Sequence, residues 1–387
     1  MSVTDKTTRD YNIDFLRIAS MLMIVSLHSM SHGGMYDFGY SLRGINIYSI
    51  WFTFVQSICV VSVNVYVLIS GYFLVKEKFR ISKFLKIVCE VLFYSWIIIS
   101  IRIYLCGLEG LDIKDLLSAF LPITYIEYWF VSAYIAMYVL VPVLNLLINS
   151  ISQKQLFGVV CILVSVFSIL NSVLPLSQIM GVKSFGQSMV FFVVLYIIGA
   201  FLRLYIEKGQ WRNYAKKYFW VSILFMNLWF LVTTFGTTAM GIDILNNERA
   251  QFVLKWFFAY NSLPVLIASV ALFHFCRGIT ISNLRYIKVI KVITPLVFGV
   301  YLIHDNPHLR DFVWMNLKNS HIPHPLLPIT AILYTIVVFI LCLVIDYVRF
   351  LLFNIVHKKE WYRSWSSDLD KKIYEKFNYL YLLLFKK

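Results

Sequence analysis

Long apolar runs, joined by short polar linkers, set the pattern of this chain from residue 13 onward. Each run holds about 20 residues, the length at which an α-helix crosses the hydrocarbon core of a membrane. Neither a soluble domain nor an internal repeat is evident along the 387 residues. The pattern predicts an all-α integral membrane protein of about ten transmembrane helices, at residues 13–32, 50–74, 84–105, 128–149, 156–175, 187–206, 217–236, 253–274, 292–310 and 328–350.

Composition supports this fold class. The chain is 60% hydrophobic and 14% charged, whereas an average soluble domain is about 45–50% apolar and about 25% charged. So few charges would not cover a soluble core of this apolar content. Six cysteines lie almost entirely inside apolar runs and form no CxxC pair, which favours buried thiols over a disulfide framework or a cysteine-based zinc site. No cleavage signal follows the first run, so we expect it to stay as a helix.

The distribution of charge predicts the orientation. A net charge of +15 would suggest nucleic acid in a soluble chain, but in a membrane protein it reflects basic residues gathered on the cytoplasmic side. When the N-terminus is placed inside and the helices alternate, most of the 35 Lys and Arg residues fall on the inner side. Both termini are therefore predicted to be cytoplasmic. We expect a transmembrane domain at 1–356 and a cytoplasmic amphipathic tail at 357–387, bound to anionic lipid.

The first apolar run carries three ionisable side chains, Asp14, Arg17 and His28. An Arg or Asp at the bilayer centre costs at least about 2.5–3.5 kcal/mol, so such groups normally face the protein interior or a wet cavity. Arg17 and His28 are 11 residues apart, which puts them on one helix face about 16 Å apart along the axis. Asp14 is within pairing reach of Arg17. Two structural roles are alternatives to a place in such a cavity. Asp14 and Arg17 can instead anchor the helix end at the membrane interface, and His28 can instead bond a neighbouring helix.

The stretch IDFLRIASMLMIVSLH places ten residues between Arg17 and His28. Four further stretches follow, VYVLISGYFL (65–74), KFRISKFLKIVCEVLFYSW (78–96), EYWFVSAYIAMYVLVPVLN (127–145) and TPLVFGVYLIHDNP (294–307). Together and in this order they resemble motifs of the acyltransferase-3 family, multi-pass bacterial enzymes that O-acylate cell-surface glycans. The resemblance spans residues 12 to about 350. The sequence departs from the family at Lys83 and Lys86, where many relatives carry arginines, and a lysine cannot make a bidentate fork to phosphate.

The resemblance implies transfer of an acetyl or other short acyl group from cytoplasmic acyl-CoA to a hydroxyl of a surface polysaccharide or its lipid-linked precursor, in the bacterial plasma membrane. It implies a catalytic histidine at His28. A neutral imidazole can take the proton of a sugar hydroxyl as that oxygen attacks a thioester, and an acyl-histidine relay is the alternative. Arg17 is expected to bind a phosphate or orient the pantetheine arm, held by Asp14. Acetyl-CoA is then a cosubstrate, and we expect no permanently bound cofactor and no nucleic-acid partner.

Two further sets of residues are candidates. The basic residues that follow the second run could bind the phosphates of CoA. The excess of Lys and Arg usual in cytoplasmic loops is the alternative explanation for them. The donor-binding candidates are Arg80, Lys83, Lys86 and the intramembrane acid Glu90. Polar groups elsewhere in the apolar runs are expected to line a cavity, contact the acceptor or supply an oxyanion donor, or else to bond neighbouring helices. These are Asn64, Ser70, Trp129, Tyr301 and His304.

Two other functions compete with acyl transfer. A transporter or flippase for a polar substrate would use Arg17 and His28 to line a path, but it would more usually show inverted repeats and paired broken helices, and the sequence indicates neither. A zinc enzyme would use histidines four residues apart. His28 and His32 have this spacing, as do His304 and His308, with His321 and His324 nearby. HExxH is absent, Gly33 follows the first pair, and Pro307 interrupts the second.

Overall fold

The computed structural model of the chain describes residues 9–35, 44–174, 186–318 and 326–385. These residues form helices and no strand. Nine of the helices are long and apolar enough to cross a membrane, and Met189–Tyr205 is a shorter apolar helix of 17 residues. The predicted all-α multi-pass fold is confirmed, and each of the ten predicted runs corresponds to one of these helices.

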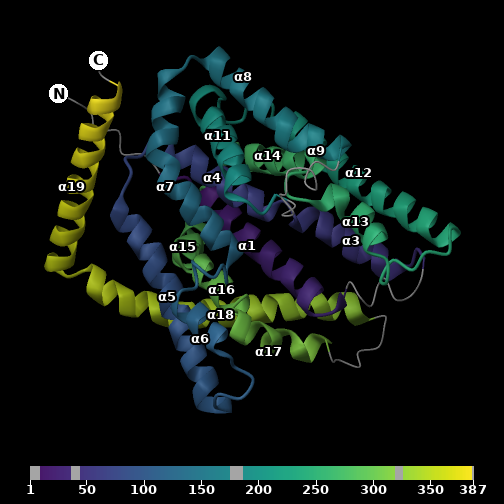
Figure 1. Cartoon of the computed structure of the whole chain (residues 1–387). Coiled ribbons are helices and arrows are strands. Elements are labelled where there is room, and N and C mark those ends of the chain that lie inside the picture. The colour runs from purple at the N-terminus through teal and green to yellow at the C-terminus, as the bar shows by residue number, and fades with distance from the viewer. Residues whose placement is uncertain (1–8, 36–43, 175–185, 319–325, 386–387) are drawn as a thin grey trace.

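Figure 1 shows the arrangement of the helices, with α1 crossing the middle of the bundle. Their bounds are α1 Tyr11–His32, α3 Ile47–Cys59, α4 Ser62–Leu74, α5 Ile81–Cys106, α6 Ile113–Phe120, α7 Trp129–Ser150, α8 Gln153–Val164, α9 Leu170–Val173, α11 Met189–Tyr205, α12 Arg212–Ala239, α13 Glu248–Lys255, α14 Leu263–Arg277, α15 Leu284–Ile293, α16 Val297–His304, α17 Pro307–Lys318, α18 Leu327–His357 and α19 Glu360–Phe385. A π-helical turn, Ser165–Ile169, joins α8 to α9.

Three of the ten predicted spans, each drawn from the sequence as one continuous run, are interrupted in the structure. The second span divides into α3 and α4 at Val60, the eighth into α13 and α14 around a 3₁₀ turn at Trp256–Phe258, and the ninth into α15 and α16 at Thr294–Leu296. Side chains satisfy backbone groups beside these breaks, as polar residues do at breaks within membranes. Ser62 Oγ donates to the Cys59 carbonyl at 2.7 Å, and Asn64 Nδ2 donates to the Tyr260 carbonyl at 2.8 Å.

The ninth span ends earlier than predicted, at His304 rather than at residue 310. The chain turns at Asp305 and Asn306, and a separate helix, α17, begins at Pro307. Pro307 has no N–H to continue α16 but is well suited to a first helical turn. The Asn306 side chain accepts from the His308 N–H at 2.9 Å. The turn matters for the site because it directs Asp305 toward α1.

Contacts at one end of the bundle support the predicted alternation of helices. Lys208, after α11, bonds Asp10, before α1, at 2.6 Å. Asn12 Nδ2 donates to the Cys276 carbonyl near the end of α14 at 2.9 Å. The Arg17 guanidinium lies 5.4 Å from the centre of the Phe73 ring near the end of α4. We call this side, predicted to be cytoplasmic, the inner face.

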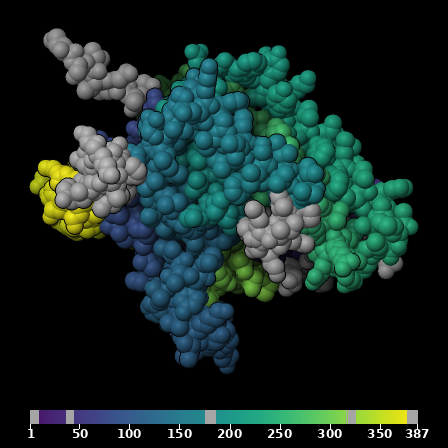
Figure 2. Space-filling view, turned by 45° about the horizontal axis from the view of Figure 1, so that its top comes forward, coloured from purple at the N-terminus to yellow at the C-terminus, as the bar shows by residue number. Residues whose placement is uncertain are grey.

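Helices α5 and α19 extend beyond the central bundle. Figure 2 shows the outer end of α5 and α6 projecting from the body of the molecule. At the inner face, α19 stands beside the start of α5 (Figure 1), where the Asp370 carboxylate accepts from Ser82 N and Oγ at 2.8 and 2.6 Å. The predicted tail is therefore helical, and its attachment to anionic lipid stays a prediction.

A buried charge cluster joins α5 to α18. Arg349 donates to Glu90 at 2.9 Å and to the two Asp346 oxygens at 2.9 and 2.6 Å. Tyr94 donates to Asp346 at 2.6 Å. Gly299 of α16 packs directly against the Asp346 carboxylate, where a Cβ atom would collide with it. Two helices, α5 and α18, are therefore joined by charges that have little access to solvent, and α16 packs closely against them at Gly299.

The cluster leads to a stability prediction. Replacement of Arg349 by Gln should lower the free energy of unfolding by about 3–5 kcal/mol, because it leaves buried carboxylates without their cation. Denaturant unfolding of the purified protein in detergent micelles measures this change. Lys154→Gln, at an exposed cation on α8, is the charge-matched control. If both variants unfold alike, the cluster does not hold these helices together.

Candidate active site

A cavity of about 630 Å³ runs along α1 between its two ends. Arg17, Lys86 and Glu90 line it toward the inner face, whereas His28, His32 and Lys255 line it toward the outer side. Between them the wall is largely apolar, with Met21, Ile24, Leu27 and Val63. The shared helix face predicted for Arg17 and His28 is thus realised as one wall of a single cavity.

His28 is part of a hydrogen-bond chain that sets which nitrogen carries its proton. His304 Nδ1 lies 2.6 Å from the Val300 carbonyl, and a carbonyl only accepts, so Nδ1 is the donor. A neutral His304 then presents a lone pair at Nε2, which lies 2.9 Å from His28 Nδ1. His28 Nδ1 must therefore donate, and His28 Nε2 keeps its lone pair. Since His28 lines the cavity, it offers an available base there.

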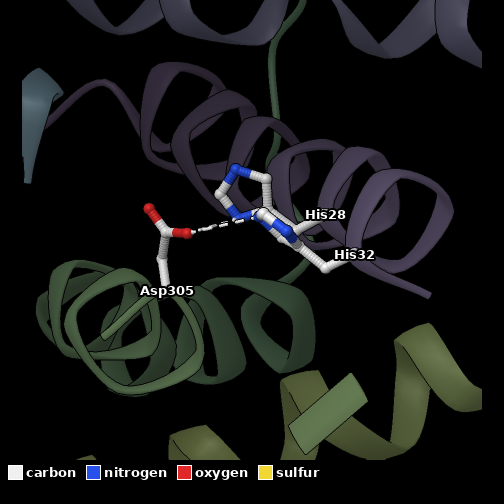
Figure 3. Close-up of side chains that lie close together, drawn as sticks. All are labelled: His28, His32 and Asp305. Atoms are coloured by element: carbon white, nitrogen blue, oxygen red, sulfur yellow. Dashed lines mark ion pairs between the residues drawn. The ribbon is translucent and has the colours of Figure 1, made fainter. Parts of the chain in front are cut away.

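Asp305 adds a carboxylate to the histidines, and the sequence analysis did not identify it. Its Oδ1 atom lies 3.5 Å from His28 Nδ1 and 3.8 Å from His32 Nε2, and Figure 3 shows it turned toward both rings. Burial raises the pKa of Asp305, which lies just beyond the α16 span, while His304, Arg310 and His32 oppose this effect. The only sequence signal was its position directly after the Tyr-Leu-Ile-His motif.

The same residues contain the elements of a metal site. One ligand atom each from His28, His32 and Asp305 lie within 4.8 Å of one another, and two histidines with a carboxylate can bind zinc. The second predicted pair does not form, because His304 bonds His28 whereas His308 contacts Arg102 at 3.0 Å. His321 and His324 lie outside the described residues.

Arg17 is held as the sequence predicts. Asp14 is buried and accepts from Arg17 Nη1 at 2.8 Å, and it also accepts from Arg9 Nε at 2.5 Å. About a third of the Arg17 side chain stays exposed, and it lines the inner end of the cavity. Tyr66, which the sequence analysis missed, donates to the Arg17 carbonyl at 2.7 Å and fixes α4 against this part of α1. Asp14 supports Arg17 from behind and does not line the cavity.

The predicted donor-binding residues divide into two groups. Lys86 and Glu90 line the inner end of the cavity, although Glu90 is paired with Arg349. Arg80 and Lys83 do not line it. Arg80 precedes the first turn of α5 as an exposed residue, and Lys83 bonds Glu77 at 2.5 Å.

The predicted acceptor-side residues divide similarly. Ser70, Trp129 and Tyr301 line the cavity. The Tyr301 hydroxyl is buried and interacts with the Asp305 side chain, although it makes no hydrogen bond of good geometry with the described residues. Asn64 instead bonds the helix break at Tyr260, and His304 is completely buried behind His28. These two residues shape the site without lining it.

Comparison with known proteins identifies the family to which the chain belongs. The chain matches the model of an acyltransferase domain, that of the acyltransferase-3 family, over residues 10–347. No curated protein and no solved structure matches it. The matched residues include α1 with the whole cavity and end before α19. With a match over nearly its entire length and a fold of apolar membrane-crossing helices, the chain belongs to the acyltransferase-3 family and is a membrane acyltransferase.

Proposed function

We propose that the protein transfers an acetyl or other short acyl group from cytoplasmic acyl-CoA to a hydroxyl of a surface polysaccharide or its lipid-linked precursor, in the bacterial plasma membrane. The observation that carries this proposal is one cavity with a cation at its inner end and a histidine farther out. The thioester arm enters beside Arg17 and Lys86, and the acceptor enters from the outer side. His28 lies where the two meet.

In the proposed reaction, His28 Nε2 takes the proton of the acceptor hydroxyl while that oxygen bonds to the thioester carbonyl carbon. The carbon–sulfur bond then breaks, and the imidazolium returns the proton to the departing thiolate, which gives an ester and free CoA. During these steps, His28 Nδ1 stays hydrogen-bonded to His304 Nε2. The buried Tyr301 hydroxyl supplies a donor for the oxyanion.

A zinc-dependent reaction is the second candidate, because His28, His32 and Asp305 gather three ligand atoms. A metal bound through His28 Nδ1 would replace the hydrogen bond to His304, whereas the base mechanism uses that bond. Arg310 also lies 3.9 Å from Asp305 and opposes a cation there. We therefore favour the general base, and metal analysis of the active enzyme separates the two mechanisms.

The first test removes the base. His28→Ala should lower the turnover number by about 10²–10⁴-fold, the usual contribution of general base catalysis. CoA release from acetyl-CoA, followed with purified protein and a glycan acceptor, measures the rate. Thermal unfolding provides the control for folding. Full transfer by a folded His28→Ala variant would refute the role of His28.

The second test concerns the tautomer. His304→Leu removes the acceptor for the His28 Nδ1 proton and should reduce the turnover number about tenfold or more, because the wrong nitrogen can then hold the proton. His304→Gln keeps a carbonyl oxygen that can accept this proton and should restore part of the rate. The pH profile of turnover should shift in His304→Leu and return toward the wild-type profile in His304→Gln. Equal rates and profiles for the two variants would contradict this positioning role.

The third test concerns the donor. Arg17→Ala should chiefly raise the KM for acetyl-CoA, by about tenfold, because a charge-assisted contact worth about 1.5 kcal/mol is lost. Initial rates at varied acetyl-CoA measure KM and kcat separately. Arg80→Ala removes a nearby cation that does not line the cavity and is the matched control. An unchanged KM in Arg17→Ala would limit Arg17 to a topological role.

A further inference from the structure

The outer half of the cavity carries polar residues that the acyl-transfer mechanism does not use. Gln56 comes from α3, Gln187 precedes α11, and Lys255 ends α13. They converge from three segments that are far apart in the sequence, on the side from which the acceptor is proposed to enter. Amide groups both donate and accept hydrogen bonds, as sugar hydroxyls require.

The positive charge of Lys255 is not neutralised within the described residues. No acidic side chain there lies within 4.0 Å of its ammonium group. Glu90 is the one acidic residue among those that line the described cavity, and it is paired with Arg349 toward the inner face. The outer half therefore presents a cation to whatever enters it.

Aromatic rings line the same cavity as this cation. Trp129 and Tyr260 both line the cavity, with ring centres 5.7 Å apart and planes inclined by 30°. Tyr260 follows Lys255 by five residues, across the break between α13 and α14. The two rings give this part of the cavity an apolar surface on which the C–H face of a sugar ring can pack.

We infer that the outer half of the cavity binds an anionic glycan acceptor, whose carboxylate or phosphate contacts Lys255 while its sugar ring packs on Trp129 and Tyr260. Gln56 and Gln187 bond the sugar hydroxyls. This inference rests on the proposed function, because it assigns a chemical class to the acceptor of the same reaction. The anionic group can belong to an acidic sugar or to the phosphate of a lipid-linked precursor.

Binding measurements test the inference without turnover. The protein in nanodiscs of zwitterionic lipid, with CoA present, is titrated with tetragalacturonate and with its uncharged methyl ester. Glucose 1-phosphate and glucose form the phosphate pair. We expect tighter binding of the charged member in at least one pair, and we expect Lys255→Gln to raise its Kd about two- to fivefold, as for a partly exposed ion pair. Lys255→Glu should raise it further.

Arg249→Gln is the matched control, since Arg249 is an exposed cation on the same helix that does not line the cavity. A preference for tetragalacturonate alone assigns an acidic polysaccharide, and a preference for glucose 1-phosphate alone assigns a sugar phosphate. The inference is overturned if neither pair shows a difference that depends on Lys255, or if Arg249→Gln has the same effect. His28→Ala should keep the anion preference while losing transfer, so failure of the proposed function is distinguishable from failure of this inference.

Discussion

Ionisable groups inside a membrane-spanning bundle must be paired or must face a wet space, and this constraint organises the whole structure. Arg349 is surrounded by two carboxylates, and Arg277 donates to three backbone carbonyls at 2.6–3.0 Å. Such groups hold helices together, and neither arginine lines the cavity. Arg17 and Lys86, by contrast, present charge to the cavity. The constraint thus separates cations that stabilise the fold from those available for binding.

Breaks in the helices follow the same logic. Irregular backbone at membrane depth is tolerated where it lines a cavity or is covered by protein. All three interruptions contribute to the cavity wall, through Val60, through Phe258 to Tyr260, and through Pro295. Each break thus places residues of the irregular backbone at the cavity wall. Broken helices are therefore compatible with an acyltransferase, and they do not by themselves indicate transport.

The sequence predicted those parts of the structure that depend on local pattern. Apolar length placed ten spans, and the helical period placed Arg17 and His28 on one face, because both follow from a single helix. Contacts between segments that are far apart in the sequence could not be predicted from this local pattern. The bond from His28 to His304 and the approach of Asp305 both require α16 to end early. A span drawn through to residue 310 hides this turn. Likewise, Arg80 and Lys83 had the right charge, but only packing shows that they do not line the cavity.

In the proposed reaction, the apolar middle of the cavity shields the thioester from water along the path from the inner end to His28. Met21, Ile24 and Leu27 line the stretch of α1 between Arg17 and His28. Displacement of water from this stretch by the pantetheine arm strengthens the polar contacts at both ends and limits hydrolysis. In the same proposal, the hydroxyl that His28 Nε2 activates enters from the outer side. A base alone would activate water as well as an alcohol, so selectivity in the proposed reaction depends on the bound acceptor displacing water from the site.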